Sequence, residues 1–271
     1  YSSLWLLLVR VWGVRMMPQL SRFMLEMLGS SCQEKANHTV NDIFKLQSII
    51  AHTKGKSMKF SANLGFLWTE LTLPDAIRAA KDAGFDGVEV QFPYDVNAQD
   101  IVNALARYEL KMVSINCPPP NYTGGEPGWA AVPDLQPRFQ RDFMRATRYA
   151  KTLGAQHLHI MAGVAEGPEA QATYIKNLAW AAAQVPAQSL LIEPINRGDM
   201  PGYFLHDFDR AAAILSEVNA PNLRLLFDAY HAAKITGDVN ATWTAMRDVT
   251  AHVQVAQTPD RSEPDIGEID Y

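Results

Sequence analysis

Three oxygen-bearing side chains stand late in three successive apolar runs of the chain. Glu193 and Asp228 each follow directly on such a run, and Gln254 lies near the end of a third. Two carboxylates and an amide oxygen are ligands that Mg²⁺ or Mn²⁺ prefers over the thiol- or imidazole-rich sets of zinc. Such a cation would stabilise the enediolate formed when a proton leaves the carbon beside a carbonyl. We predict that all three residues bind a divalent cation and that a carboxylate within reach moves the proton between adjacent carbons.

Each of these three side chains, and each histidine near them, could have either a structural or a functional role. Any one of the three residues alone could be a capped or ion-paired side chain at a strand end, and their matching positions favour a shared site. His231, three residues after Asp228, is either an ordinary loop histidine or a group that binds a substrate oxygen. His157 and His159 alternate on one strand, so their side chains share a face. For both histidines we favour a role in packing or in supporting the site over metal ligation.

From Met58 onward, short apolar runs alternate with helical patterns, and Pro74 and Gly84 bracket one helix as a first-turn proline and a stop. Continuous apolar strands that alternate with helices predict a parallel sheet covered by helices. The expected strands are 59–64, 88–92, 112–116, 157–161, 190–195, 223–227 and 252–256, and the expected helices are 74–83, 97–108, 138–153, 169–184, 207–218 and 239–249.

Two architectures fit this alternation, a doubly wound sheet and a (β/α)₈ barrel. A doubly wound sheet should carry a glycine-rich phosphate turn after an early strand, and Gly65–Trp68 is no such turn. A barrel has eight units in about 250 residues, whereas 58–271 holds 214 residues and seven strands. We therefore predict an α/β protein with a TIM barrel truncated before its eighth strand. The carboxyl ends of barrel strands form the active-site face, which would bring Glu193, Asp228 and Gln254 together.

The first 57 residues differ from the rest in charge. They hold seven basic and three acidic side chains, against 17 basic and 26 acidic ones in 58–271. We interpret 1–57 as an N-terminal extension and 58–271 as the catalytic domain. The extension could be a targeting or anchoring segment, a part packed on the barrel, or a translated upstream stretch without structure. The last of these is favoured, because the character of the sequence changes at Met58.

The composition limits the classes of partner. A formal net charge of −5 argues against a nucleic-acid surface. The apolar stretch 4–14 is interrupted by Arg10 and is shorter than a membrane span. Only Cys32 and Cys117 are present, so a reducing cytoplasm is the expected setting. The expected partner is a small-molecule substrate, and the sequence leaves open whether the protein forms a homo-oligomer.

Several motifs together resemble those of the hydroxypyruvate isomerases, which are xylose-isomerase-like TIM barrels. The resemblance covers 58–271 and none of the extension. It rests on Ile192–Asn196, Phe227–His231 and His252–Ala256, with further matches at Phe60–Leu64, Phe92–Tyr94, 124–133 and 263–271.

The resemblance implies conversion of hydroxypyruvate to tartronate semialdehyde, a step of glyoxylate metabolism, by two glutamates that exchange a proton. Glu193 matches the first, and the second belongs to a Gly-x-Glu-Tyr motif on an eighth strand, beyond Tyr271. In related ketose epimerases, Glu193, Asp228 and Gln254 match three of four metal ligands. His231 and Arg261 match substrate-oxygen contacts. The chain departs from many relatives at Ile115, where they carry a histidine.

Three alternatives stay open. The substrate could be another small sugar acid such as 2-oxo-tetronate. The chain could be an inactive fragment of such an enzyme, since a barrel without its last strand has open edges and lacks half of the proton-transfer pair. A DNA-repair endonuclease on a similar barrel would need a basic groove and several histidine ligands, against which the acidic balance and the sparse histidines argue.

Overall fold

The computed structural model describes residues 58–117 and 127–271, so the extension 1–57 lies outside the described residues. Seven strands form one parallel sheet in the order of the sequence, without a reversal. This consecutive order is that of a TIM barrel and excludes a doubly wound sheet, whose strand order reverses. The strands are β1 Ser61–Asn63, β2 Gly87–Val90, β3 Lys111–Asn116, β4 His157–His159, β5 Ser189–Ile192, β6 Leu223–Asp228 and β7 Thr250–Gln254.

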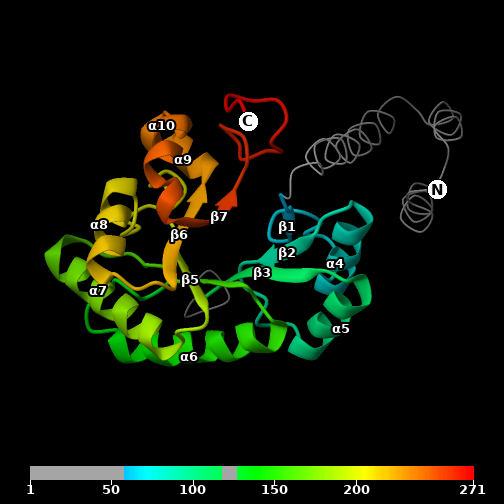
Figure 1. Ribbon diagram of the computed structural model, residues 1–271, viewed down its shortest axis with the longest axis horizontal. Helices are drawn as coiled ribbons and strands as arrows, with labels where there is room; N and C mark the ends of the chain where they lie inside the picture. Colours follow the sequence, from blue (N-terminus) through cyan, green and yellow to red (C-terminus); the bar gives the residue numbers. More distant parts are fainter. Residues whose placement is uncertain (1–57, 118–126) are drawn as a thin grey trace, which may run out of the picture.

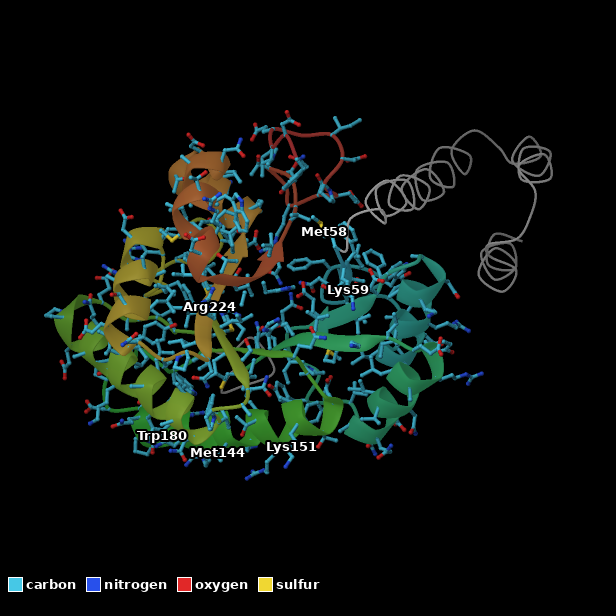
Figure 2. All side chains as sticks on the ribbon, in the orientation of Figure 1. Met58, Lys59, Met144, Lys151, Trp180 and Arg224 are labelled. Atoms are coloured by element: carbon cyan, nitrogen blue, oxygen red, sulfur yellow. The ribbon has the colours of Figure 1, made fainter. Side chains whose placement is uncertain are left out.

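The helices lie along the outer side of the curved sheet, and β1 and β7 stand at its two free edges (Figure 1). Met144, Lys151 and Trp180 mark the outer rim formed by two of these helices (Figure 2). Within the described residues no strand pairs β1 with β7, so the barrel is not closed. The helices are α4 Leu73–Asp82, α5 Ala98–Tyr108, α6 Gln136–Leu153, α7 Gly167–Gln184, α8 Phe208–Val218, α9 Ala229–Thr236 and α10 Val239–Met246, the last followed by a 3₁₀ turn at Arg247–Val249.

Local chemistry explains where the helices begin and end. The Thr72 side chain accepts a hydrogen bond from the backbone N–H of Asp75 and caps α4. Gly154 adopts the left-handed conformation that ends α6, as the sequence indicates. Between its ends, α6 buries Phe139 and Phe143, which pack edge-on against Trp180 of α7.

Several elements differ from the sequence expectation: β1 and β4 are shorter than expected, β7 begins and ends two residues earlier, and the two largest differences concern α9 and β5. Helix α9 was not expected, because it has only eight residues and starts directly after β6. Strand β5 was expected to reach Ile195 but ends at Ile192. Pro194 has no N–H for the sheet, and the N–H of Ile195 donates instead to the carbonyl of Leu205.

Alternation along the last strand directs its side chains to two sides of the sheet. Val253 and Val255 are 43% and 47% exposed, whereas His252 and Gln254 are partly buried and contact Glu89 of β2. Gln254 is also the pairing partner of Asp228 in the register of β6 and β7. The interior of the curved sheet therefore carries polar groups from several strands. None of the helices in the described part of the chain is long and apolar enough to cross a membrane.

Candidate active site

Asp228 joins strand β6 to helix α9 and sets the geometry of the site. One oxygen, Oδ1, accepts hydrogen bonds from the backbone N–H groups of Tyr230 (2.9 Å) and His231 (3.3 Å) and so caps α9. The carboxylate is 1% exposed. The cap uses Oδ1, whereas Oδ2 faces Arg261 and His231, and His231 is held in the first turn of the helix.

Glu193, Asp228 and His231 form a buried cluster. One side-chain oxygen or nitrogen atom from each lies within 4.8 Å of the others. His231 Nε2 is 3.7 Å from Glu193 Oε1 and 3.8 Å from Asp228 Oδ2. The structure thus brings together two side chains predicted to bind metal, at the ends of β5 and β6, and one predicted to bind substrate, in the first turn of α9.

The proton on His231 can be assigned from its neighbours. The backbone N–H of Asp199 donates to Asn196 Oδ1, so the Asn196 Nδ2 group faces the imidazole. This Nδ2 lies 2.8 Å from His231 Nδ1, and the Asn196 backbone N–H also donates to that nitrogen. Since Nδ1 accepts, the neutral ring carries its proton on Nε2. His231 therefore offers an N–H donor beside the two carboxylates, which suits a substrate oxygen better than a metal ion.

Arg261, from the loop after β7, approaches the same cluster. Its Nη2 donates to Asp228 Oδ2 at 2.5 Å, and its guanidinium stacks on the rings of Phe66 (4.7 Å) and Tyr230 (5.0 Å). Its Nη1 is 3.3 Å from His231 Nε2. Both of these nitrogens are donors, so they do not bond to each other, and their N–H groups stand close enough to share one anionic oxygen.

The burial of the site changes its acid–base properties. Burial, and next the neighbouring Asp228 carboxylate, raise the pKa of Glu193 well above its ordinary value. Arg261 opposes this rise. His159 of β4 lies 3.5 Å from Glu193, and burial lowers the pKa of its imidazole to about 3, so it is neutral at physiological pH. A raised pKa makes the carboxylate a stronger base, which suits it to accept a proton from carbon and to return it.

The acidic residues suit a divalent cation. Asp228, which pairs with Arg261, and Glu193 each offer a carboxylate oxygen, and these atoms lie within 4.8 Å of each other. Carboxylate oxygens are preferred ligands of Mg²⁺ and Mn²⁺. Gln254 stands beside Asp228 in the sheet, but its contact is to another residue: its Nε2 donates to Glu89 Oε1 at 2.9 Å.

Glu89 and Asn196 are part of this region and were not predicted from the sequence. Glu89 is 5% exposed on β2 and lies between the apolar residues Val88 and Val90. An acidic residue inside an apolar strand is a signal, because a buried charge requires partners. Asn196 carries no comparable signal, since its role depends on contacts 35 residues away.

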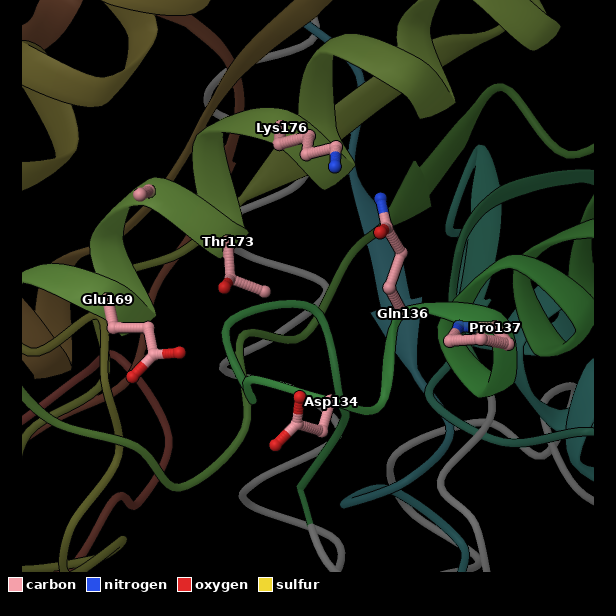
Figure 3. A pocket seen from close by; sticks show the side chains of 7 residues that line it. Asp134, Gln136, Pro137, Glu169, Thr173 and Lys176 are labelled. Atoms are coloured by element: carbon pink, nitrogen blue, oxygen red, sulfur yellow. The ribbon is translucent and has the colours of Figure 1, made fainter.

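A hollow of about 440 Å³ lies elsewhere, between the start of α6 and helix α7 (Figure 3). Asp134, Gln136, Glu169, Thr173 and Lys176 are among its lining residues. It is open to solvent on the outer layer of helices. The strand ends, by contrast, combine buried ionisable groups with convergent donors, and we therefore locate the candidate active site there.

Comparison with known proteins agrees with this geometry. Residues 77–271 match the family model described as xylose isomerase-like TIM barrel. The chain belongs to the xylose isomerase-like TIM-barrel family. This confirms the fold class and the family predicted from the sequence motifs.

Members of this xylose isomerase-like family that resemble the chain over most of their length include isomerases. The chain is 40% identical to the 2-oxo-tetronate isomerase of Cupriavidus necator and 34% identical to the hydroxypyruvate isomerase of Escherichia coli (strain K12). Each match covers 79% of this chain, and 84% and 85% of the two relatives, respectively. A solved structure described as AP endonuclease, family 2, from Brucella melitensis is 36% identical, with a TM-score of 0.76 over 79% of this chain and 85% of that one.

Proposed function

We propose that the protein is an isomerase of small 2-oxo acids that converts hydroxypyruvate to tartronate semialdehyde. The observation that carries the proposal is the buried cluster of Glu193, Asp228 and His231, with Arg261 beside it. It combines a carboxylate of raised pKa with N–H donors for substrate oxygens. The names of the two related isomerases support the same class of reaction.

The reaction moves one proton between two adjacent carbons. The Glu193 carboxylate takes a proton from the hydroxymethyl carbon, whose C–H electrons form a carbon–carbon double bond as the carbonyl electrons move to oxygen. Glu193 then returns the proton to the former carbonyl carbon, and the hydroxyl proton moves to the other oxygen, leaving an aldehyde. Nothing is oxidised or reduced overall. In this proposal one carboxylate carries the proton, in place of the two that the family resemblance implies, because both carbons are neighbours on the same substrate.

The other groups act on the oxygens of the substrate. The Nε2–H of His231 and the guanidinium of Arg261 stabilise the negative charge of the enediolate by hydrogen bonding. A divalent cation, Mg²⁺ or Mn²⁺, would add Lewis-acid stabilisation of that charge when bound. The residues proposed to hold it are Glu193, Asp228 and, through its amide oxygen, Gln254.

The closest alternative substrate is 2-oxo-tetronate, which is favoured by the higher identity to the Cupriavidus necator relative. Assays of the folded chain with hydroxypyruvate and with 2-oxo-tetronate decide between the two by the ratio of kcat/KM. Turnover of neither substrate by protein with a cooperative unfolding transition would refute the proposal and favour a chain without catalysis.

Glu193→Gln tests the central role. Removing a general base costs about 10²- to 10⁴-fold in rate, so we expect a loss of kcat in this range with little change in melting temperature. Glu166→Gln, at a carboxylate that is 75% exposed and forms a surface ion pair with Arg197, is the matched control and should keep its turnover. Retained turnover in Glu193→Gln would remove this residue from the mechanism.

A further inference from the structure

Glu89 ties the last strand of the sheet to the second strand across its interior. Its Oε1 accepts from Gln254 Nε2 at 2.9 Å, and its Oε2 is 2.6 Å from His252 Nε2. These partners are 165 and 163 residues away in sequence. Both are inward-facing residues of β7, so one carboxylate holds both with its two oxygens.

The hydrogen bond between Glu89 and Gln254 determines the orientation of the Gln254 side-chain amide. An ionised carboxylate only accepts hydrogen bonds, so the amide must direct its NH₂ group toward Glu89. Its carbonyl oxygen, Oε1, then lies on the other arm of the amide. A hard cation binds amide oxygen and not amide nitrogen. Without Glu89 the amide could rotate and present its nitrogen, which cannot serve as a ligand.

The neighbouring groups hold the carboxylate in turn. Because Oε2 accepts, His252 Nε2 carries a proton, and the His252 ring stacks on that of His157 with 5.6 Å between centroids. His157 Nδ1 lies 2.8 Å from the hydroxyl of Ser189 on β5. Hydrogen bonds thus join Glu89 of β2 to β7, and the stacked ring of His157, itself in contact with Ser189, packs against His252. Contacts on more than one side of a group limit the orientations of its side chain.

We infer that Glu89 is a positioning residue, which presents the amide oxygen of Gln254 to the divalent cation. This rests on the proposed function, in which Gln254 helps to hold the cation. Glu89 itself need not touch substrate or cation, because it acts through the amide of Gln254 that it holds.

A double-mutant cycle on the whole chain tests this, with Mn²⁺ affinity measured by electron paramagnetic resonance of the free ion. Loss of an outer-shell partner costs about 10- to 100-fold in metal affinity, which is the weakening expected for Glu89→Met. Gln254→Ala should weaken binding to a similar extent. If Glu89 acts through Gln254, the Mn²⁺ affinity of the double variant should lie within about threefold of that of Gln254→Ala alone.

The controls separate the possible failures. Glu109→Gln removes an equal charge at an exposed side chain and should leave Mn²⁺ affinity unchanged. Circular dichroism monitors folding, and if Glu89→Met does not fold, the cycle is run with Glu89→Gln, which keeps the size of the side chain. If the loss of Mn²⁺ affinity in the double variant equals the product of the two single losses, the positioning role is overturned while the proposed function stays intact. Failure of the unaltered protein to bind Mn²⁺ would instead refute the cation site itself, and the positioning role with it.

Discussion

Replacing Arg261 with methionine removes the positive charge nearest to Asp228 and keeps a long side chain against Phe66 and Tyr230. Asp228 is 1% exposed, so its remaining charge would have little water to replace the guanidinium. Breaking a fully buried ion pair by removing one partner costs about 3–5 kcal/mol. Since the Arg261 side chain is 24% exposed, part of the pair is already solvated. We expect Arg261→Met to lower the free energy of unfolding by about 2–3 kcal/mol.

Replacing the other partner of this ion pair should lower the free energy of unfolding by less. In Asp228→Asn the amide oxygen can still cap α9, because asparagine is also a good N-cap residue. The unpaired Arg261 can turn toward solvent, and the repulsion between residue 228 and Glu193 is removed. We therefore expect a loss of about 1 kcal/mol, and a double variant that is more stable than the sum of the two losses predicts.

Urea unfolding followed by circular dichroism at pH 7, without added divalent cation, measures these differences. Arg197→Met is the matched control, because the ion pair of Arg197 with Glu166 joins side chains that are 50% and 75% exposed. Such surface pairs contribute about 0–1 kcal/mol. Equal losses in Arg261→Met and Arg197→Met, or a larger loss in Asp228→Asn than in Arg261→Met, would refute the reasoning.

Two further predictions concern stability. Burial, and next the charge of His252, lower the pKa of His157 to about 4. The unfolded chain therefore takes up this proton first, and stability falls as the pH drops from about 6.5 toward 4. With allowance for partial exposure, His157→Gln should remove about 1–2 kcal/mol of that fall in urea titrations, and parallel curves would contradict this. Gly128 has a φ of 101°, and a Cβ there would lie 2.4 Å from the carbonyl oxygen of Met161. Gly128→Ala should cost about 2–4 kcal/mol in thermal unfolding, against about 1 kcal/mol for Gly154→Ala, where a Cβ meets nothing within 4 Å; equal costs would exclude the clash.

The order of the elements could be predicted because each strand and helix leaves a local signal. Apolar runs mark the strands, and Pro74 and Gly154 mark a helix start and a helix end. Helix α9 could not be recognised from hydrophobic periodicity, because eight residues are too few to show a helical period. Its limits were nevertheless present in the sequence, since Asp228 is a favourable cap and Gly237 adopts the left-handed conformation that ends the helix.

The candidate site could be predicted in part for a related reason. Parallel strands bring their carboxyl ends to one edge, so the positions of Glu193 and Asp228 follow from the strand pattern. The position of Arg261 does not, because it lies in a loop without a period, and only the family resemblance indicated a role. Its place against Asp228 depends on the tertiary path of the chain after β7.

Orientation within the site is a separate matter from position, and it depends on partners distant in sequence. The Asn196 amide faces the imidazole of His231, which lies on another element, and thereby assigns the ring proton to Nε2. Glu89 likewise fixes the amide of Gln254 from across the sheet. A strand-end rule locates a functional group but does not say which of its atoms faces the substrate. In this fold a hydrogen bond from a second, remote strand or loop decides that, so substitution of such a partner should change what a site residue presents without moving its backbone.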